Sequence, residues 1–164
     1  MTLPISKTFC VALLLICAVH SCKPSKINIQ EHKKPNIVLI NIDDLGYKDV
    51  GFMGSQYYET PNLDALAQEG MIFYNAYAGA ANCAPSRACL ISGLNTPRHG
   101  VYTVSPSDRG NTKTRKLIPI KNTNHLNDTI FTLPQMLKSA GYVTGSFGKW
   151  HVGKDPSTQG IDVN

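Results

Sequence analysis

Charge, long apolar runs and paired cysteines are all scarce in this sequence. Charged residues make up 16% of the 164 residues and hydrophobic residues 42%, a balance typical of a globular protein rather than a disordered one. No apolar run reaches the roughly 20 residues that a membrane-spanning helix needs. The net charge is +5, but the basic residues form no stripe interleaved with aromatic side chains, which argues against nucleic-acid binding. A basic balance also suits an anionic substrate.

The five cysteines do not form the framework of a disulfide-stapled domain. Cys10 and Cys17 lie in an N-terminal apolar segment, and Cys22 follows that segment closely. Only Cys83 and Cys89 remain, and a bond between them would close a very small loop. Cys83 therefore needs an explanation other than a disulfide.

Residues 1–22 are predicted to be an export signal rather than part of the fold. Lys7 supplies a positive start, and the apolar run from Phe9 to Val19 is too short to cross a bilayer. A small residue directly before Cys22 resembles the processing site of a bacterial lipoprotein, in which an acylated Cys22 anchors the protein to a membrane. The alternative is an ordinary cleaved signal. Either way we expect export, to the periplasm or, as a lipoprotein, to the outer membrane or cell surface of a bacterium.

Residues 23–34 are polar and are predicted to form a tether, and the ordered part is expected to begin at residue 35. Apolar residues at nearly every position from Asn36 to Ile42 predict a strand that is buried on both faces, as in a parallel sheet. Further strands are predicted at residues 71–77 and 142–150.

Helix signals alternate with these strands. Helices are predicted from Thr60-Pro61, with Thr60 as the cap, to Gly70, over residues 88–94, and from Thr132 to Gly141. The alternation predicts an α/β fold with a mostly parallel central sheet flanked by helices. Residues 104–129 show little periodicity and are predicted to be a loop.

Two acidic residues, Asp43 and Asp44, directly follow the first predicted strand. Ligands of open α/β sheets bind at the carboxyl ends of strands, so a site is well placed here. Adjacent carboxylates are stabilised by a hard divalent cation, which prefers oxygen ligands. From this dipeptide alone, an ordinary polar turn is the better interpretation.

The sequence after Cys83 is typical of a helix start. Pro85 suits a first helical turn, where its missing N–H is not needed. Cys83 would then lie at a helix N-terminus, where free N–H groups and the helix dipole favour an anion. Arg87 follows one turn later on the same face, where a guanidinium can bind a tetrahedral oxyanion. These residues alone allow either a reactive thiolate at Cys83 or a buried structural cysteine.

A cation and an imidazole, Lys149 and His151, lie two residues apart at the end of the last predicted strand. On an extended chain they point to the same side, which suits anion binding and proton transfer. Taken alone, a solvated strand end explains them as well.

Together, these three segments resemble the sulfatase family. Cys83 to Arg87 matches the family's Cys-x-Pro-x-Arg core, which a maturation enzyme reads when it oxidises the cysteine to formylglycine. Gly141 to His151 resembles the second family signature, and Pro35 to Asp44 resembles the opening strand with its metal-binding pair. The resemblance covers residues 35–164 and implies the N-terminal portion of an alkaline-phosphatase-like catalytic domain.

The resemblance also implies a role for each matched residue. Cys83 would become formylglycine, whose hydrate attacks sulfur to give a covalent sulfated intermediate. Arg87 would hold that hydrate, and Lys149 would bind the sulfate and the formylglycine oxygen. His151 would contact the hydrate and take its proton.

Asp43 and Asp44, with the formylglycine made from Cys83, are implied to hold a calcium ion that neutralises the sulfate oxygens. Calcium takes about six to eight oxygen ligands, more than these residues and the substrate supply. The family provides the others, with a further Lys and His, from much farther along the chain. We therefore expect the sequence to be truncated and to carry half of an active site.

The implied substrate is a sulfated small molecule or polysaccharide, and for an exported bacterial enzyme we expect a sulfated polysaccharide. Within loop 104–129, Arg109, Arg115 and Lys116 could line a pocket for an anionic saccharide or could simply be solvated. Two other functions remain open, namely a formylglycine-dependent phosphonate or phosphodiester hydrolase and a non-catalytic truncated surface lipoprotein.

The isolated 164-residue chain is predicted to hydrolyse an aryl sulfate poorly, because the implied ligand set is incomplete. The measurement is turnover of a chromogenic aryl sulfate by the purified chain, with Cys83→Ala as the blank. Robust turnover that disappears in Cys83→Ala would contradict the prediction.

Overall fold

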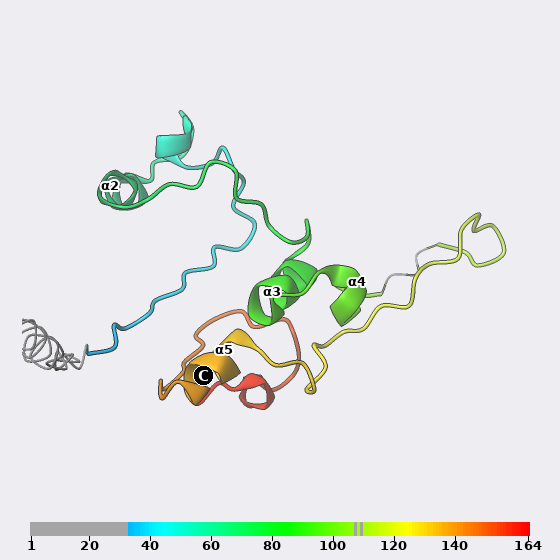
Figure 1. Cartoon of the computed structure of the whole chain (residues 1–164). Coiled ribbons are helices and arrows are strands. Elements are labelled where there is room, and N and C mark those ends of the chain that lie inside the picture. Colours follow the sequence, from blue (N-terminus) through cyan, green and yellow to red (C-terminus); the bar gives the residue numbers. More distant parts are fainter. Residues whose placement is uncertain (1–32, 107, 109) are drawn as a thin grey trace, which may run out of the picture. The chain divides into compact units, whose positions relative to one another are not determined.

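A computed structural model describes residues 33–106, 108 and 110–164 (Figure 1). The predicted signal, Cys22 and most of the predicted tether lie outside the described residues, as does Arg109. The chain divides into two units, Met1–Ile40 and Asn41–Asn164. Of the first unit, residues 33–40 are described and form an exposed stretch without helix. Among the described residues, no helix has the length and apolar character needed to cross a membrane.

The second unit contains every described helix, and two of the six are short 3₁₀ turns. In chain order, they are η1 (Gly51–Met53), α2 (Pro61–Glu69), α3 (Cys83–Ser92), α4 (Thr96–His99), α5 (Leu133–Ser139) and η2 (Pro156–Gln159). The predicted helices after Thr60 and Thr132 are confirmed. Helix α3 contains most of the predicted run 88–94 and begins at Cys83, where Pro85 had indicated the helix start.

Helix α2 begins at Pro61 as predicted, but Thr60 does not cap it. The Thr60 hydroxyl instead accepts a hydrogen bond from the Gly51 N–H at 2.7 Å and donates one to Asp64 Oδ1 at 3.0 Å. The same carboxylate oxygen accepts the Phe52 N–H at 2.8 Å. The expected cap residue thus joins α2 to η1.

The predicted strands are not formed among the described residues, so the predicted central sheet is not confirmed for this chain. The only β-type pairing there is an isolated parallel bridge between Gly145 and Val163. A strand needs a neighbour to satisfy its backbone groups, and no described segment pairs with residues 36–42 or 71–77. Their apolar side chains are therefore uncovered: Val38 is 83% exposed and Met71 80%.

The buried core gathers beneath α3. Two small residues of this helix, Ala84 and Ala88, pack with Val101, Leu126 and Val152. All five are at most 5% exposed. Because the buried core residues of α3 are alanines, the helix lies close to the segments that follow α4 and precede α5.

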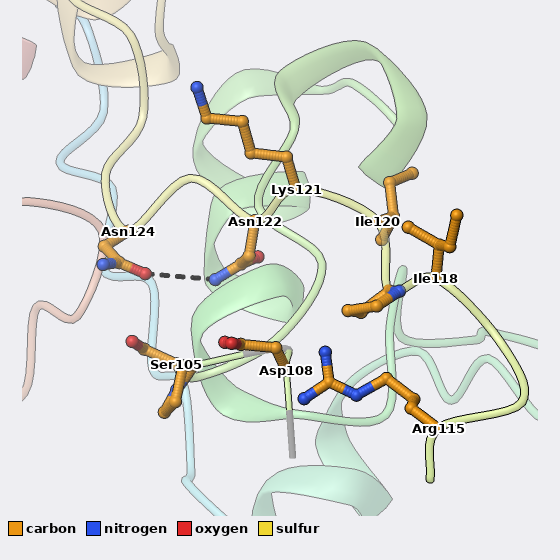
Figure 2. Close-up of a pocket in the computed structure, with 10 residues that line it drawn as sticks. Ser105, Asp108, Arg115, Ile118, Ile120, Lys121, Asn122 and Asn124 are labelled. Atoms are coloured by element: carbon orange, nitrogen blue, oxygen red, sulfur yellow. Dashed lines mark hydrogen bonds between the residues drawn. The ribbon is translucent and has the colours of Figure 1, made fainter. Parts of the chain in front are cut away.

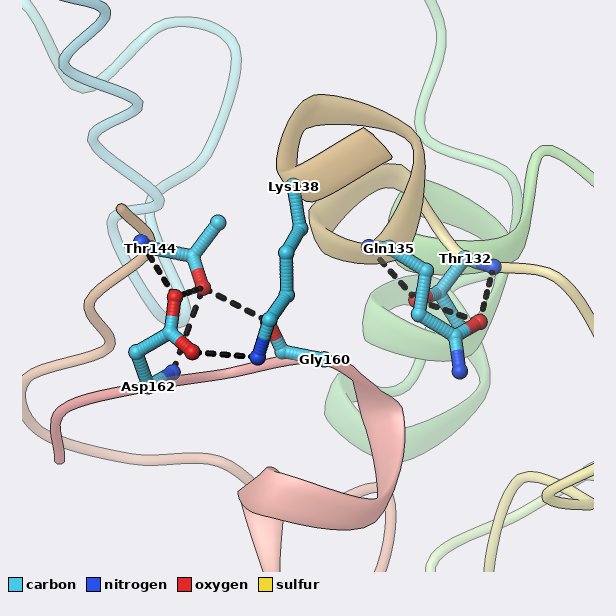
Figure 3. Close-up of polar contacts among 6 residues, drawn as sticks. All are labelled: Thr132, Gln135, Lys138, Thr144, Gly160 and Asp162. Carbon is cyan, nitrogen blue, oxygen red and sulfur yellow. Dashed lines mark hydrogen bonds and ion pairs between the residues drawn. The ribbon is translucent and has the colours of Figure 1, made fainter. Parts of the chain in front are cut away.

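A capping box holds the start of α5 (Figure 3). The Thr132 hydroxyl accepts the Gln135 N–H, and the Gln135 side chain accepts the Thr132 N–H at 2.9 Å. Thr132 also donates to the Gln159 carbonyl at 2.7 Å. A Cβ at Gly160 would lie 2.8 Å from the Gln135 nitrogen, so only glycine allows the chain after η2 to pass this close. The start of α5 and the end of η2 are therefore held together.

The end of the described chain is tied to the segment that leads toward Lys149. Thr144 donates its N–H to Asp162 Oδ2 at 3.0 Å and its hydroxyl to the Gly160 carbonyl at 2.6 Å (Figure 3). Lys138 forms an ion pair with Asp162 and lowers the pKa of that carboxyl to about 2. These contacts fix residues 144–146.

We predict that Thr132→Ala destabilises the natural protein that carries this chain, whereas Thr132→Ser does so far less. Alanine removes the cap and the bond to the Gln159 carbonyl, at a cost of about 1–2 kcal/mol. Serine keeps the hydroxyl. The measurement is chemical unfolding followed by circular dichroism. Equal loss in both variants would show that the Thr132 methyl, not its hydroxyl, stabilises this corner.

Candidate active site

Cys83 occupies the first position of α3, as predicted. The two following residues, Ala84 and Pro85, are buried and anchor the first turn, while Cys83 remains half-buried. The preceding residue, Asn82, donates its side-chain N–H to the Thr103 hydroxyl at 3.4 Å. The helix therefore presents the Cys83 side chain at its positive end, where an anion is favoured.

One carboxylate, that of Asp43, joins the three motif segments. Asp43 Oδ1 accepts Arg87 Nη2 at 3.0 Å, and Asp43 Oδ2 accepts the Lys149 ammonium. The other Arg87 amino group donates to the Lys149 carbonyl. The side chain of Arg87 is only 12% exposed, so its orientation is tightly held. Asp43, Arg87 and Lys149, three of the residues that the resemblance assigns to one site, thus lie together.

The charges in this cluster support one another. Lys149 and then Arg87 hold the pKa of Asp43 below its ordinary value. Asp43 raises the pKa of Lys149, and Cys83 acts on Lys149 in the same direction. Asp43 is therefore ionised and Lys149 protonated throughout the neutral range. The dependence of Lys149 on Cys83 also places the ammonium within electrostatic reach of the sulfur.

Asp44 and His151 have left-handed backbones, with φ of 56° and 63°. Non-glycine residues rarely adopt this conformation, and where they do they cluster at functional sites. His151 interrupts the extended run, so the expectation that it shares a side with Lys149 on a strand is wrong. Among the described residues, neither Asp44 nor His151 has a hydrogen bond or ion pair to Cys83 or Arg87, and His151 Nδ1 is buried without a partner.

The carboxylates of Asp43 and Asp44 suit a hard cation in chemistry, although they are few in number. Within the described part of the chain, no three His, Cys, Asp or Glu side chains gather as a metal would require. A thiol at Cys83 is a poor ligand for calcium, whereas the oxygen of a formylglycine is a suitable one. The donors present fit a calcium ion only if further oxygen ligands come from outside the described residues.

Three residues that the sequence interpretation did not connect support the base of α3. A Cβ at Gly79 would lie 2.5 Å from Cys89 Cβ, so the loop that leads to Cys83 packs directly on Cys89. Cys89 Sγ lies 3.3 Å from His99 Nε2, and the Val101 N–H donates to His99 Nδ1 at 3.1 Å. Neutral His99 therefore carries its proton on Nε2, toward the sulfur. Both Cys83 and Cys89 are free thiols, as expected.

Comparison with known proteins gives a consistent assignment. Residues 35–163 match a family model described as Sulfatase. The chain belongs to the sulfatase family. Sulfatases generally use formylglycine and a divalent metal, and their structures imply an alkaline-phosphatase-like fold, whose sheet the described residues do not form.

Particular relatives are similar over most of this chain. Over 74% of its own length, this chain is 42% identical to the N-acetylgalactosamine-6-sulfatase of Rattus norvegicus. Over 94% of its own length, it is 39% identical to the N-acetylgalactosamine-6-O-sulfatase of Bacteroides thetaiotaomicron. The crystal structure of Ps i-CgsB matches 79% of the chain, with 38% identity and a TM-score of 0.65. The chain spans only 22% to 27% of these proteins.

His99 is predicted to make stability fall as the pH drops below about 6.5. Burial lowers the pKa of His99 from its ordinary 6.5, so the unfolded chain binds this proton more readily than the folded one. The contribution of His99 is complete above 6.5 and is lost as the pH falls toward the lower folded value. The measurement is the free energy of unfolding of the natural protein between pH 7.5 and 5.

His99→Asn, which keeps an acceptor for the Val101 N–H, is expected to flatten that dependence. The exposed His125 provides the matched control, and His125→Asn should leave the pH slope unchanged. The carboxylate of Asp162 titrates at about 2 and so does not act in this window. A wild-type slope in His99→Asn would assign the effect to another group.

Proposed function

We propose that the natural protein carrying this chain is a sulfatase that hydrolyses sulfate esters at the site around Cys83. The observation that carries the proposal is the junction of Arg87, Asp43 and Lys149 beside Cys83. Each of these residues belongs to a different segment that resembles the family. A purely structural role would not require two cations and a potential nucleophile to meet at a partly exposed helix N-terminus.

The proposed chemistry depends on formylglycine at position 83, which supplies a geminal diol as the attacking group and is regenerated when sulfate leaves. Arg87 orients that diol, and its guanidinium is fixed by the bonds to Asp43 and the Lys149 carbonyl. Lys149 stays protonated and donates to a sulfate oxygen, which stabilises the charge that develops there. His151 takes the proton of the diol.

Asp43 and Asp44 are the residues that would hold a calcium ion, which supplies positive charge opposite the sulfate oxygens. The bond between Asp43 and Lys149 also keeps the ammonium on the same side as the carboxylates. Maturation requires an enzyme that recognises the run from Cys83 to Arg87 and oxidises the thiol. Export through residues 1–22, with acylated Cys22 as a membrane anchor, remains part of this proposal.

A sulfated polysaccharide is the substrate class that we propose. In support, a neighbour 36% identical to this chain was solved in complex with k-i-k-neocarrahexaose. The names of two relatives specify the 6-sulfate of N-acetylgalactosamine, which is also a sulfated sugar. The basic balance of the chain, +5, suits a polyanionic substrate.

The proposal is tested in two measurements on the natural protein. Mass spectrometry of the Cys83 peptide from the native host should give a peptide lighter than the thiol form, because formylglycine replaces the sulfur by an oxygen. Lys149→Gln should lower aryl-sulfate turnover by about 100-fold, the usual effect of removing one charge-stabilising donor. Lys154→Gln, an exposed lysine of the same segment, is the matched control and should change little.

The competing functions give different results in the same assays. A formylglycine-dependent phosphonate or phosphodiester hydrolase would contain the lighter peptide but prefer phosphorus esters when both classes are offered. A non-catalytic surface lipoprotein would retain the Cys83 thiol and turn over neither ester. Either result would replace the sulfatase proposal.

A further inference from the structure

A pocket of about 440 Å³ lies in the long segment between α4 and α5 (Figure 2). Its volume falls in the range of about 300–1,000 Å³ that is usual for small-molecule sites. Its polar lining includes Ser105, Asp108, Arg115, Lys121, Asn122 and Asn124, and isoleucine and proline side chains supply the apolar part. The pocket is thus mixed in character, as suits a sugar with polar edges and apolar faces.

Hydrogen bonds connect this pocket to the residue that precedes the nucleophile. Asn122, on the pocket wall, accepts the Tyr102 and Thr103 N–H groups at 2.7 and 3.0 Å. Its amide donates to the Thr103 carbonyl at 3.1 Å. The Thr103 hydroxyl in turn accepts from Asn82, which directly precedes Cys83. These bonds connect the pocket wall, through Thr103, to the residue that precedes Cys83.

The charge of the pocket favours an anion. Arg115 and Lys121 supply two positive charges against the single carboxylate of Asp108. No ion pair joins Arg115 to Asp108 within the described residues. Arg115 donates from Nη2 to the Gly110 carbonyl at 3.2 Å, while its buried Nε finds no acceptor in the described chain. Figure 2 shows the guanidinium turned toward the space between Asp108 and Ile118. Arg115 therefore keeps donors available for a ligand oxygen.

We propose that this pocket is a second binding site for the polysaccharide, in which Arg115 binds an anionic group on a sugar next to the one that is cleaved. Lys121, whose ammonium is turned away from Arg115 (Figure 2), adds positive charge at the pocket wall. The inference rests on the proposed sulfatase function, and it explains how a chain of repeated sulfated sugars is distinguished from a small sulfate ester. A polymer reaches both the helix N-terminus at Cys83 and the pocket, whereas an aryl sulfate reaches only the first. Guanidinium groups suit sulfate because two of their donors can bind it together.

The test compares two substrates in the natural protein and in Arg115→Gln and Lys121→Gln. Each variant removes one charge and keeps a polar side chain of similar length. For a sulfated neocarrahexaose, KM should rise about tenfold in Arg115→Gln and by a smaller factor in Lys121→Gln. The variants should lose more kcat/KM with the hexasaccharide than with an aryl sulfate, by the factor given for KM. The reason is that the aryl sulfate does not extend to the pocket. Lys113→Gln is the matched control, since Lys113 is an exposed cation of the same loop that does not line the pocket.

A binding measurement tests this inference independently of the proposed function. Titration calorimetry with the hexasaccharide uses protein that carries Cys83→Ala, in which no turnover occurs. Weaker binding in the Arg115 and Lys121 variants supports the pocket even if the natural protein cleaves no sulfate ester. Unchanged binding and KM would overturn it even if aryl-sulfate turnover is robust. An equal loss in Lys113→Gln, or equal binding of a desulfated hexasaccharide, would also overturn it, because the charge would then act without a specific site.

Discussion

The paired bonds of the Asp43 carboxylate to Arg87 and Lys149 are the interaction on which the arrangement of the candidate active site depends. The two carboxylate oxygens bind Arg87 and Lys149, which lie 44 and 106 residues away in the sequence. Without that carboxylate, two cations would lie near each other beside the positive end of α3 with no anion between them. With it, each group stabilises the charged form of its neighbours. The cluster is therefore both a link between distant segments and an electrostatic environment for an anion.

Local sequence predicts part of this structure well. The start of α3 at Cys83 follows from Pro85, and the end follows from Gly93, whose φ of 67° suits glycine. The capping box at Thr132 and Gln135 is similarly local, since both partners lie within one turn. Such features need only a few neighbouring residues, so periodicity and cap residues are sufficient to find them. The same reasoning did not find α4, because its four residues are too few to show a periodic pattern.

The failures concern relations between distant residues. Residues 36–42 have the composition of a buried strand, but a strand forms only with a partner, and no described segment provides one. The place of Asp43 between Arg87 and Lys149 could be expected only from resemblance, since no local spacing connects them. The packing of Gly79 on Cys89, and of Cys89 on His99, left no recognisable signal in the sequence because each contact depends on the shape of the folded chain.

Under the proposed function, the burial of the first turn of α3 has a consequence for the timing of maturation. Ala84 and Pro85 are buried, and Arg87 is engaged with Asp43 once the helix has packed. An enzyme that must grip this short run in order to oxidise Cys83 would find its middle residues inaccessible in the folded protein. Oxidation and folding would then compete for the same segment, and the yield of active molecules would depend on which event comes first as the chain emerges.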